Sequence, residues 1–245
     1  MSEKNRTAIV TGASKGIGAA LAKRLAADGF QTLVNYSASA AEAEAVVAAI
    51  TAAGGRAKAV RGDVAAASAV KALFDVAEAE FGPVDVLVNN AGIMKLSALA
   101  EVTDEDYQRH IAVNLTGAFN GMREGARRVR DGGRIINIST SLIGVYRANS
   151  SVYVATKAAV EALTHVLAKE LGARGVTVNA VAPGPVATEL FLAGQTEAFV
   201  QRAIQDTPLG RLGEPDDIAP IVSFLASPES GWISGQVIKA NGGRN

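Results

Sequence analysis

Short apolar runs and longer alanine-rich segments alternate along the chain. The runs are rich in Val and Ile and are apolar at consecutive positions rather than at every second one. Parallel strands buried between two layers of helices have this pattern, because neither face of the sheet meets solvent. The predicted strands are Thr7–Thr11, Gln31–Asn35, Ala57–Arg61, Val84–Asn89, Arg134–Ile138, Thr177–Val181 and Gln236–Ala240.

The segments between these runs predict helices. They are Ile17–Asp28, Ala41–Ala53, Ala66–Phe81, Asp104–Arg130, Val152–Ala173 and Pro215–Leu225. Strands that alternate with helices predict an α/β protein, with a doubly wound parallel sheet of about seven strands flanked by helices. No linker, repeat or low-complexity break interrupts the 245 residues, so we expect a single domain over residues 1–245.

Composition narrows the classes of function. Lys and Arg number 24 and so do Asp and Glu, which gives no net charge to favour nucleic acid or an anionic membrane. The chain has no cysteine and only two histidines, which argues against disulfides and metal sites. We expect no bound metal, with His110 on a helix surface and His165 structural. No apolar run approaches the roughly 20 residues of a membrane span and no cleavage signature is seen, so we expect a cytoplasmic protein.

A glycine-rich turn follows the first predicted strand and leads into a helix. Residues 11–18 are Thr-Gly-Ala-Ser-Lys-Gly-Ile-Gly. Glycines allow a tight turn and let backbone N–H groups approach a phosphate, which the positive end of the helix dipole also favours. The spacing is G-x-x-x-G-x-G rather than G-x-G-x-x-G, and an ordinary glycine turn is the alternative interpretation. The dinucleotide-binding residues expected here are Gly12, Ser14, Lys15, Gly16, Ile17 and Gly18.

The end of the second strand indicates which dinucleotide is bound. Asn35, Tyr36 and Ser37 stand where an acidic residue would bind the ribose 2′-hydroxyl of NAD and repel a 2′-phosphate. No acid is present, whereas Lys15 in the glycine turn offers a positive charge, and Asn35 and Ser37 offer hydrogen bonds. We therefore expect NADP(H) in preference to NAD(H).

Two further turns follow predicted strands. Asp63 and Val64 follow the third strand, where the carboxylate is placed either to accept a hydrogen bond from adenine or to cap the next helix. Asn90, Ala91 and Gly92 follow the fourth strand, at the carboxyl edge where open α/β sheets bind ligands. Small residues there leave room for a cofactor, although asparagines in a turn also satisfy loop backbone. We expect all five residues to line the cofactor site.

Tyr153 and Lys157 form the most informative pair in the chain. They are four residues apart at the start of a predicted helix, and therefore on one face of it. A phenol has a pKa of about 10, and a nearby ammonium stabilises the phenolate and lowers that pKa. The pair is thus suited to acid–base catalysis near neutral pH, although this spacing more commonly joins a surface lysine to a half-buried tyrosine.

In combination, these features resemble the short-chain dehydrogenase/reductase family, over nearly the whole chain from Thr7 to Gly243. The motifs that carry the resemblance are Thr-Gly-Ala-Ser-Lys-Gly-Ile-Gly at 11–18, Asp63, Asn-Asn-Ala-Gly at 89–92, Asn114, hydroxyls at 139–141, Tyr153, Lys157 and Pro-Gly at 183–184. Residues 210–215 and 235–243 are similar to the 3-oxoacyl-[acyl-carrier-protein] reductase branch. The resemblance implies a Rossmann fold and hydride transfer between NADP(H) and a carbonyl or alcohol substrate.

The resemblance also implies catalytic roles. Tyr153 would exchange a proton with the carbonyl oxygen, and Lys157 would lower the pKa of Tyr153 and bind the nicotinamide ribose. Asn114 would hold a water that links Lys157 to solvent. All three residue types are present at the matching positions.

A hydroxyl after the fifth strand would polarise the carbonyl, and two positions compete for this role. Counting from the end of the fifth strand, or 13 residues back from Tyr153, selects Thr140. Matching the family's Ser-x-x-Gly pattern, with Gly144 as its glycine, selects Ser141. Ser139 is a weaker third choice. Both Ser and Thr can make the required hydrogen bond, so Ser141 and Thr140 are both carried as candidates.

The loop after the sixth strand is implied to contact the nicotinamide through Pro183, Gly184, Val186 and Thr188. Residues 189–208 follow with little regular pattern and several apolar side chains. We expect them to form either a mobile substrate lid or a pair of short surface helices, and to favour a partly apolar substrate.

The sequence leaves the substrate and partners open. A small carbonyl or alcohol compound, an acyl group on acyl carrier protein and a sugar or polyol are alternatives, and a catalytically silent cofactor-binding sensor or scaffold is the competing function. Arg123, Arg127 and Arg128 share one predicted helix, either facing an acidic carrier protein or forming its solvated face. The resemblance implies a homotetramer, with a homodimer as the alternative, and we expect Trp232 near a subunit contact.

Overall fold

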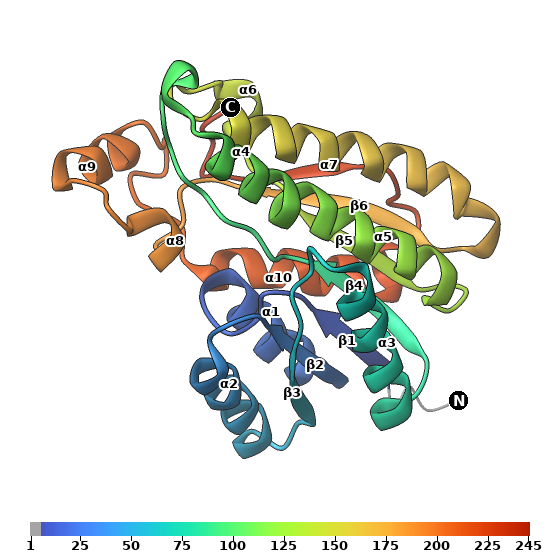
Figure 1. Cartoon of the computed structure of the whole chain (residues 1–245). Coiled ribbons are helices and arrows are strands. Elements are labelled where there is room, and N and C mark those ends of the chain that lie inside the picture. The colour runs from blue at the N-terminus through green and yellow to red at the C-terminus, as the bar shows by residue number, and fades with distance from the viewer. Residues whose placement is uncertain (1–5) are drawn as a thin grey trace.

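The computed structural model describes residues 6–245. Seven parallel strands form one sheet in the order β3-β2-β1-β4-β5-β6-β7 (Figure 1). Their bounds are β1 Arg6–Val10, β2 Phe30–Tyr36, β3 Ala57–Arg61, β4 Val84–Asn89, β5 Arg134–Ile138, β6 Thr177–Pro183 and β7 Val237–Ala240. Every predicted strand is present, and the largest difference is that β6 extends to Pro183.

Helices cover both faces of the sheet, which explains why the central strands β1, β2, β4, β5 and β6 are almost entirely buried, whereas the edge strands β3 and β7 are only partly so. On one face, Leu21, Val46 and Leu225 pack into a core under α1, α2 and α10. On the other face, Leu73 and Met122 belong to a second core under α3, α5 and α7. The helix bounds are α1 Gly16–Ala27, α2 Ala40–Ala52, α3 Ala67–Phe81, α5 Gly117–Arg128, α7 Ser151–Glu170 and α10 Pro215–Ala226. The predicted doubly wound α/β fold is confirmed.

The strand order places a crevice at one edge of the sheet. The chain builds β1, β2 and β3 in one direction and then returns to add β4 on the other side of β1. The loops after β1 and β4 therefore diverge at the carboxyl ends of these strands. Open α/β sheets bind ligands at such a switch point.

The predicted helix Asp104–Arg130 contains a local change of pitch. α4 (Asp104–His110) continues into η2 (Ile111–Thr116), a π-helical segment, and then into α5. This wider turn carries Asn114, which is 1% exposed. π-helical turns inside α-helices often occur at functional sites.

The two histidines both have structural partners. His110 is buried and not on a helix surface as predicted: its Nε2 accepts from the backbone of Lys95 at 3.1 Å, and its Nδ1 lies 2.7 Å from the carbonyl of Asp106. The turn before α4 folds over the helix and covers the ring. His165 pairs through Nδ1 with the carbonyl of Gly235 at 2.8 Å, as expected of a structural histidine. Among residues 6–245, no group of three His, Asp or Glu side chains is arranged to hold a metal.

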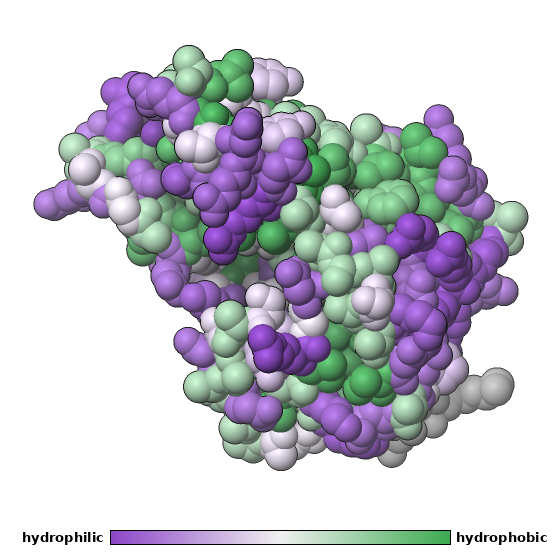
Figure 2. Space-filling model, in the orientation of Figure 1, coloured by the Kyte–Doolittle hydropathy of each residue, from purple (hydrophilic) through white to green (hydrophobic). Residues whose placement is uncertain are grey.

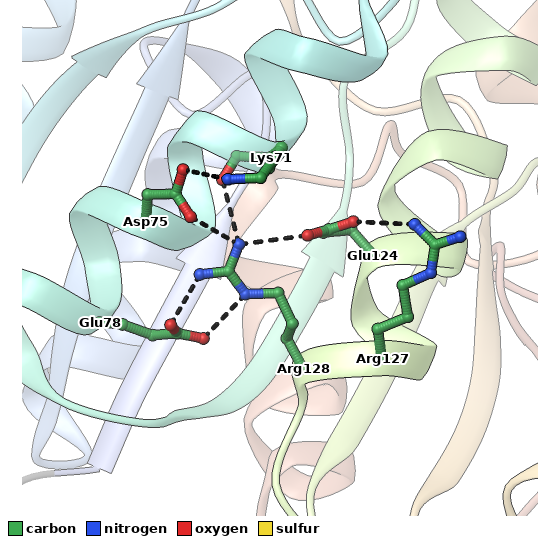
Figure 3. A network of polar contacts seen from close by, with 6 residues as sticks. All are labelled: Lys71, Asp75, Glu78, Glu124, Arg127 and Arg128. Atoms are coloured by element: carbon green, nitrogen blue, oxygen red, sulfur yellow. Dashed lines mark hydrogen bonds and ion pairs between the residues drawn. The ribbon is translucent and has the colours of Figure 1, made fainter.

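Arg128 joins α3 to α5 (Figure 3). Its guanidinium lies 2.6 Å from Glu78 and 2.8 Å from Asp75 on α3, and 3.1 Å from Glu124 on α5. Glu78 above all, with Asp75 and Glu124, holds the pKa of Arg128 above its ordinary value. Because this side chain is only 18% exposed, Arg128 is a helix-to-helix link and is not displayed for an acidic carrier protein.

A chain of buried amides lies under the crevice. Asn89 donates to Asn137 at 2.8 Å, and Asn137 donates to the hydroxyl of Thr164 at 2.8 Å, which joins β4, β5 and α7. Gly121 of α5 packs directly on this chain, because a Cβ there would lie 1.9 Å from Oδ1 of Asn89. The network fixes the position of α7 relative to the sheet.

No helix within residues 6–245 combines the length and apolar character needed to cross a membrane.

Candidate active site

A cleft of about 750 Å³ opens at the carboxyl edge of the sheet. Figure 2 shows it as a hollow between the part of the molecule that carries α8 (Glu189–Leu192) and α9 (Glu197–Gln205) and the part that carries α1 and α2. Every predicted site residue lines this cleft except Asn114. The structure therefore brings together residues that lie more than 170 positions apart in the chain.

The glycine turn is held against the turn after β4. A Cβ on Gly12 would lie 2.8 Å from Cα of Ala91, and one on Gly18 would lie 2.3 Å from the carbonyl of Gly12. Asn90 donates from Nδ2 to the carbonyls of Thr11 and Gly12 at 2.9 and 3.0 Å. The glycines are thus needed for close packing, and the Asn90 amide satisfies loop backbone, as one of the two interpretations held.

Asn35 does not have the role predicted for it. Its side chain is buried, its Oδ1 accepts from the backbone of Gly12 at 3.2 Å, and its Nδ2 donates to the carbonyls of Val60 and Gly62 at 3.3 and 2.9 Å. The amide is used to join the ends of β1, β2 and β3. Of the side chains predicted to hydrogen-bond a 2′-phosphate at this strand end, only Ser37 is left exposed.

Lys15 reaches across the mouth of the cleft. Its Nζ lies 2.6 Å from the carboxylate of Glu189, the first residue of α8, and the two side chains are 51% and 70% exposed. Ion pairs this exposed contribute little stability, so the contact is easily exchanged for another. Lys15 remains able to meet a phosphate at the glycine turn, which stays a prediction.

Asp63 neither caps α3 nor lies buried. Its Oδ1 accepts from the backbone of Ala65 at 3.0 Å, whereas the N-cap of α3 is Ala66, which has no side-chain cap. The carboxylate thus closes a turn just before the helix and also lines the cleft. The capping interpretation is wrong in detail, and contact with adenine stays a prediction.

Tyr153 and Lys157 are both buried on α7, at 9% and 4% exposure. Nζ of Lys157 donates to the carbonyl of Ile138, the last residue of β5, at 2.7 Å. Burial raises the pKa of Tyr153 to about 12, and a hydrogen bond with Thr140 lowers that pKa in part. Burial lowers the pKa of Lys157 to about 8. Burial and Thr140 account for the shift of the Tyr153 pKa, and the lowering of that pKa by Lys157 stays a prediction.

The structure distinguishes the three candidate hydroxyls. Thr140 is the one whose side chain lowers the pKa of Tyr153, and its Oγ1 accepts from the backbone of Leu142 at 3.3 Å. Ser139 instead donates to Glu161 at 2.6 Å. Ser141 lines the cleft, but its contacts are made by its backbone, which donates to the carbonyl of Pro183 at 2.9 Å and accepts from Asn245 at 3.1 Å. Geometry therefore favours Thr140 over Ser141.

Asn114 lies behind the cleft wall. Its Oδ1 accepts from the backbone of Ile93 at 2.8 Å, and its Nδ2 donates to the carbonyl of Ile93 at 2.9 Å. Gly92 separates it from Lys157, because a Cβ on Gly92 would lie 3.4 Å from Oδ1 of Asn114 and 3.5 Å from Nζ of Lys157. Asn114 therefore holds the turn that follows β4, and the predicted water relay stays a prediction.

The segment after β6 forms the pair of short helices that was one of two expectations. Thr188 accepts from the backbone of Phe191 at 3.3 Å and so caps α8. Phe191 on α8 and Phe199 on α9 line the cleft with their ring centroids 5.6 Å apart. This segment supplies an apolar wall.

The chain is similar to known proteins over nearly its whole length. A family model described as enoyl-(acyl carrier protein) reductase matches residues 12–245. NADPH-dependent aldehyde reductase 2, chloroplastic, of Arabidopsis thaliana is 48% identical over 253 residues, covering 97% of this chain and 93% of that protein. The 3-oxoacyl-[acyl-carrier-protein] reductase FabG of Staphylococcus epidermidis is 42% identical over 242 residues, covering 98% of each. A crystal structure of a short-chain dehydrogenase from Burkholderia cenocepacia in complex with NADP has a TM-score of 0.93 at 40% identity, covering 99% and 98%.

The chain belongs to the short-chain dehydrogenase/reductase family. The family resemblance inferred from the motifs is thereby confirmed, and with it the class of oxidoreductase. The comparisons include FabG proteins, in agreement with the branch suggested by residues 210–215 and 235–243.

This short-chain dehydrogenase/reductase has cleft residues that no sequence motif marks. Arg109, Arg147 and Arg244 line the cleft from three separate segments. Arg147 lies over the ring of Phe199, 4.1 Å from its centroid. Only the fold brings these arginines together, so their sequence neighbours carry no signal.

Proposed function

We propose that this protein reduces an aldehyde or ketone with NADPH, and that it oxidises the alcohol in the reverse direction. The observation that carries the proposal is the buried Tyr153, one helical turn from Lys157, in a cleft that Thr140 also lines and that begins at the glycine turn. The presence of all these groups favours an active enzyme over a catalytically silent sensor or scaffold.

The cleft fits a dinucleotide. Gly12 and Gly16 adopt positive φ angles of 60° and 56° in the turn that leads into α1, and the N-terminus of a helix favours a phosphate. Ser37 and Lys15 offer partners for a 2′-phosphate, and no acid follows β2 to repel one. The NADPH-dependent relative and the NADP complex of a structural neighbour support the same choice of cofactor. The residues proposed to hold the cofactor, besides the glycine turn, are Tyr36, Ser37, Asp63, Val64, Ala91, Gly92, Tyr153, Lys157, Pro183, Gly184, Val186 and Thr188.

The chain's own residues supply the proton chemistry, and the nicotinamide, when bound, exchanges hydride with the substrate carbon. With a pKa of about 12, Tyr153 is protonated at neutral pH and can donate its proton to the carbonyl oxygen. Lys157 has a pKa of about 8 and is mostly cationic at pH 7, so it stabilises the phenolate that this transfer leaves behind. The Thr140 hydroxyl holds the phenol oxygen in place for the transfer.

A substrate screen with NADPH and NADH side by side tests the proposal. Absorbance of the reduced nicotinamide is followed with aldehydes, ketones, a short acyl thioester as a stand-in for a carrier-bound substrate, and, in the oxidative direction with NADP and NAD, sugars and polyols. We expect carbonyl-dependent consumption of NADPH, with NADH weaker. Cofactor binding without any turnover would support the silent sensor instead.

We also propose that the protein is a homotetramer or homodimer, as the family resemblance implies. Trp232 is fully exposed in the single chain, and Phe119 on α5 is 42% exposed. Large apolar side chains left in solvent favour burial against another subunit. Light scattering measures the mass directly.

A further inference from the structure

The two ends of the cleft differ in charge. One end lies at the carboxyl end of β2 and the other at the carboxyl end of β5. Two strands, β1 and β4, lie between them, and neighbouring strands are about 4.8 Å apart, so the two ends of the cleft are roughly 14 Å apart. The acidic lining residues are Asp63, which follows β3, and Glu189, which is paired with Lys15 of the glycine turn. At the β5 end, by contrast, the charged lining residues are basic: Lys157, Arg147 and Arg244, with Arg109 also on the wall.

Arg147 has a half-buried guanidinium with no counter-charge of its own. No carboxylate within residues 6–245 lies at ion-pair distance from it, and its contact is the ring of Phe199 at 4.1 Å. Burial first, and the neighbouring Arg244 second, lower its pKa, and the more distant charge of Asp206 only partly opposes them. Leaving a partly desolvated guanidinium unpaired is costly, which points to a missing anion.

The nearest carboxylate is already shared. Asp206 lies 2.9 Å from Arg202 and 3.4 Å from Arg244, whose side chain is only 12% exposed. The carboxylate of Asp206 thus pairs with both Arg202 and Arg244, and the positive charge of Arg147 has no ion-pair partner within residues 6–245. The end of the cleft is electropositive although the whole chain has no net charge.

The backbone on either side of Arg147 adopts conformations that L-residues rarely adopt. Tyr146 has φ 48° and Asn149 has φ 67°. Such conformations persist only where the surrounding structure fixes them, and they concentrate at binding sites. Arg147 between them lies against Phe199 of the short helix α9.

We propose that Arg147 and Arg244 bind an oxyanionic group of the substrate, a carboxylate or a phosphate, while Phe191 and Phe199 contact the chain that joins it to the carbonyl. The protein then prefers anionic carbonyl compounds over neutral ones of equal size. A guanidinium suits this ligand because its planar N–H groups pair with two oxygens of a carboxylate or phosphate. The inference rests on the reductase function proposed above.

Matched pairs of anionic and neutral substrates test whether Arg147 and Arg244 bind an oxyanionic group. Keto acids with two to four methylene groups between ketone and carboxylate are compared with their primary amides, and hydroxyacetone phosphate is compared with hydroxyacetone. The kcat/KM of each is measured with NADPH for the wild type, Arg147→Gln and Arg147→Lys. Arg123→Gln is the control, because Arg123 also lies over a phenylalanine, at 5.0 Å from Phe119, but outside the cleft.

We expect the wild type to prefer the acid or the phosphate over its neutral counterpart, and the better of the two arms identifies the oxyanion. Arg147→Gln should lower kcat/KM for the anion by about ten- to a hundredfold, mainly through KM, and leave the neutral compound within about twofold. Arg147→Lys should restore part of the loss, and Arg123→Gln should change neither.

The outcomes separate the two proposals. Equal use of neutral and anionic members by the wild type would overturn the inference and leave the reductase function standing. A loss in Arg147→Gln that is the same for both members would also overturn it, because the arginine would then be structural. Turnover of no member of any pair would overturn the reductase function and the inference together.

Discussion

At the scale of single residues, burial determines the chemistry of the catalytic pair more than proximity does. Tyr153 and Lys157 both lose solvent, so the pKa of the phenol rises to about 12 and that of the ammonium falls to about 8. Both shifts favour the neutral forms. A phenol that stays protonated suits carbonyl reduction, in which the enzyme must donate a proton.

Tyr153→Phe removes the proposed proton donor and leaves the ring in place. We expect turnover to fall by about a hundredfold to ten-thousandfold, because that is what a general acid contributes. Cofactor affinity, measured by NADPH fluorescence, should stay within a few fold. Full activity in this variant would contradict the proposed mechanism.

Thr140→Ala and Ser141→Ala distinguish the two candidate hydroxyls. Thr140 lowers the pKa of Tyr153, so its removal should lower kcat by about tenfold or more with little change in cofactor affinity. Thr140→Ser should recover most of the rate, and Ser141→Ala should retain it. The reverse ranking would reassign the role to Ser141.

The lowered pKa of Lys157 predicts that the stability of the wild type, compared with that of Lys157→Met, depends on pH. Below pH 8 the ammonium of Lys157 stays charged in the folded protein, and its burial lowers the free energy of unfolding. Between pH 8 and 10.5 Lys157 is neutral in the folded protein but still protonated in the unfolded chain. The wild-type free energy of unfolding should therefore rise across this window relative to the variant, by on the order of 3 kcal/mol. Denaturant unfolding at several pH values measures the difference. A constant difference from pH 7 to pH 10.5 would show that the pKa of Lys157 is not lowered.

At the scale of elements, the site depends on helices that pack unusually closely on the sheet. Gly121 lets α5 approach β4, where Asn89 and Asn137 form their buried hydrogen bond. The same bond positions α7 through Thr164, and α7 carries the catalytic pair. The close packing of α5 thus helps to fix the positions of Tyr153 and Lys157 on α7.

Gly121→Ala tests this packing. An alanine would normally stabilise a helix by about 1 kcal/mol relative to glycine, but here its Cβ would lie 1.9 Å from Oδ1 of Asn89. We expect a net loss of about 2–4 kcal/mol in the free energy of unfolding. Gly172→Ala is the control, because nothing lies within 4 Å of a Cβ at that position. Equal stability of the two variants in thermal unfolding would refute the argument.

The sequence predicted the elements better than their local details. Apolar periodicity located all seven strands because both faces of the sheet are buried. The same periodicity could not reveal the π-helical turn at Ile111–Thr116, since one wider turn barely alters the apolar stripe. Counting along the chain could not choose between Thr140 and Ser141, because the choice depends on how the loop after β5 bends.

At the scale of the whole molecule, contacts between distant segments complete the cleft. Lys15 and Glu189 are 174 positions apart, and Arg147 meets Arg244 only through the fold. Motif spacing predicts sites that one segment carries, such as the glycine turn. It does not predict a wall that is assembled from three separate segments, which is why the arginines were missed.

The Lys15–Glu189 contact predicts a change in cofactor preference. Glu189→Gln frees Lys15 and removes a negative charge beside the proposed phosphate site. We expect the Kd for NADPH to fall by about two- to fivefold and that for NADH to change little, since an exposed pair is worth less than about 1 kcal/mol. Glu229→Gln, on an exposed residue outside the cleft, is the control. Equal effects on both cofactors would argue against Lys15 as a phosphate partner.

Different elements carry the two parts of the cleft, and this has a consequence for how substrate preference can change in evolution. Tyr153 and Lys157, the proposed catalytic pair, lie on α7, which the buried amides fasten to the sheet, whereas the apolar wall, Arg147 and Arg244 belong to outer loops and the short helices α8 and α9 (Figure 1). Substitutions in these outer segments leave the proton-transfer geometry intact. One inherited reaction centre can therefore serve many substrates, through changes confined to the rim of the molecule.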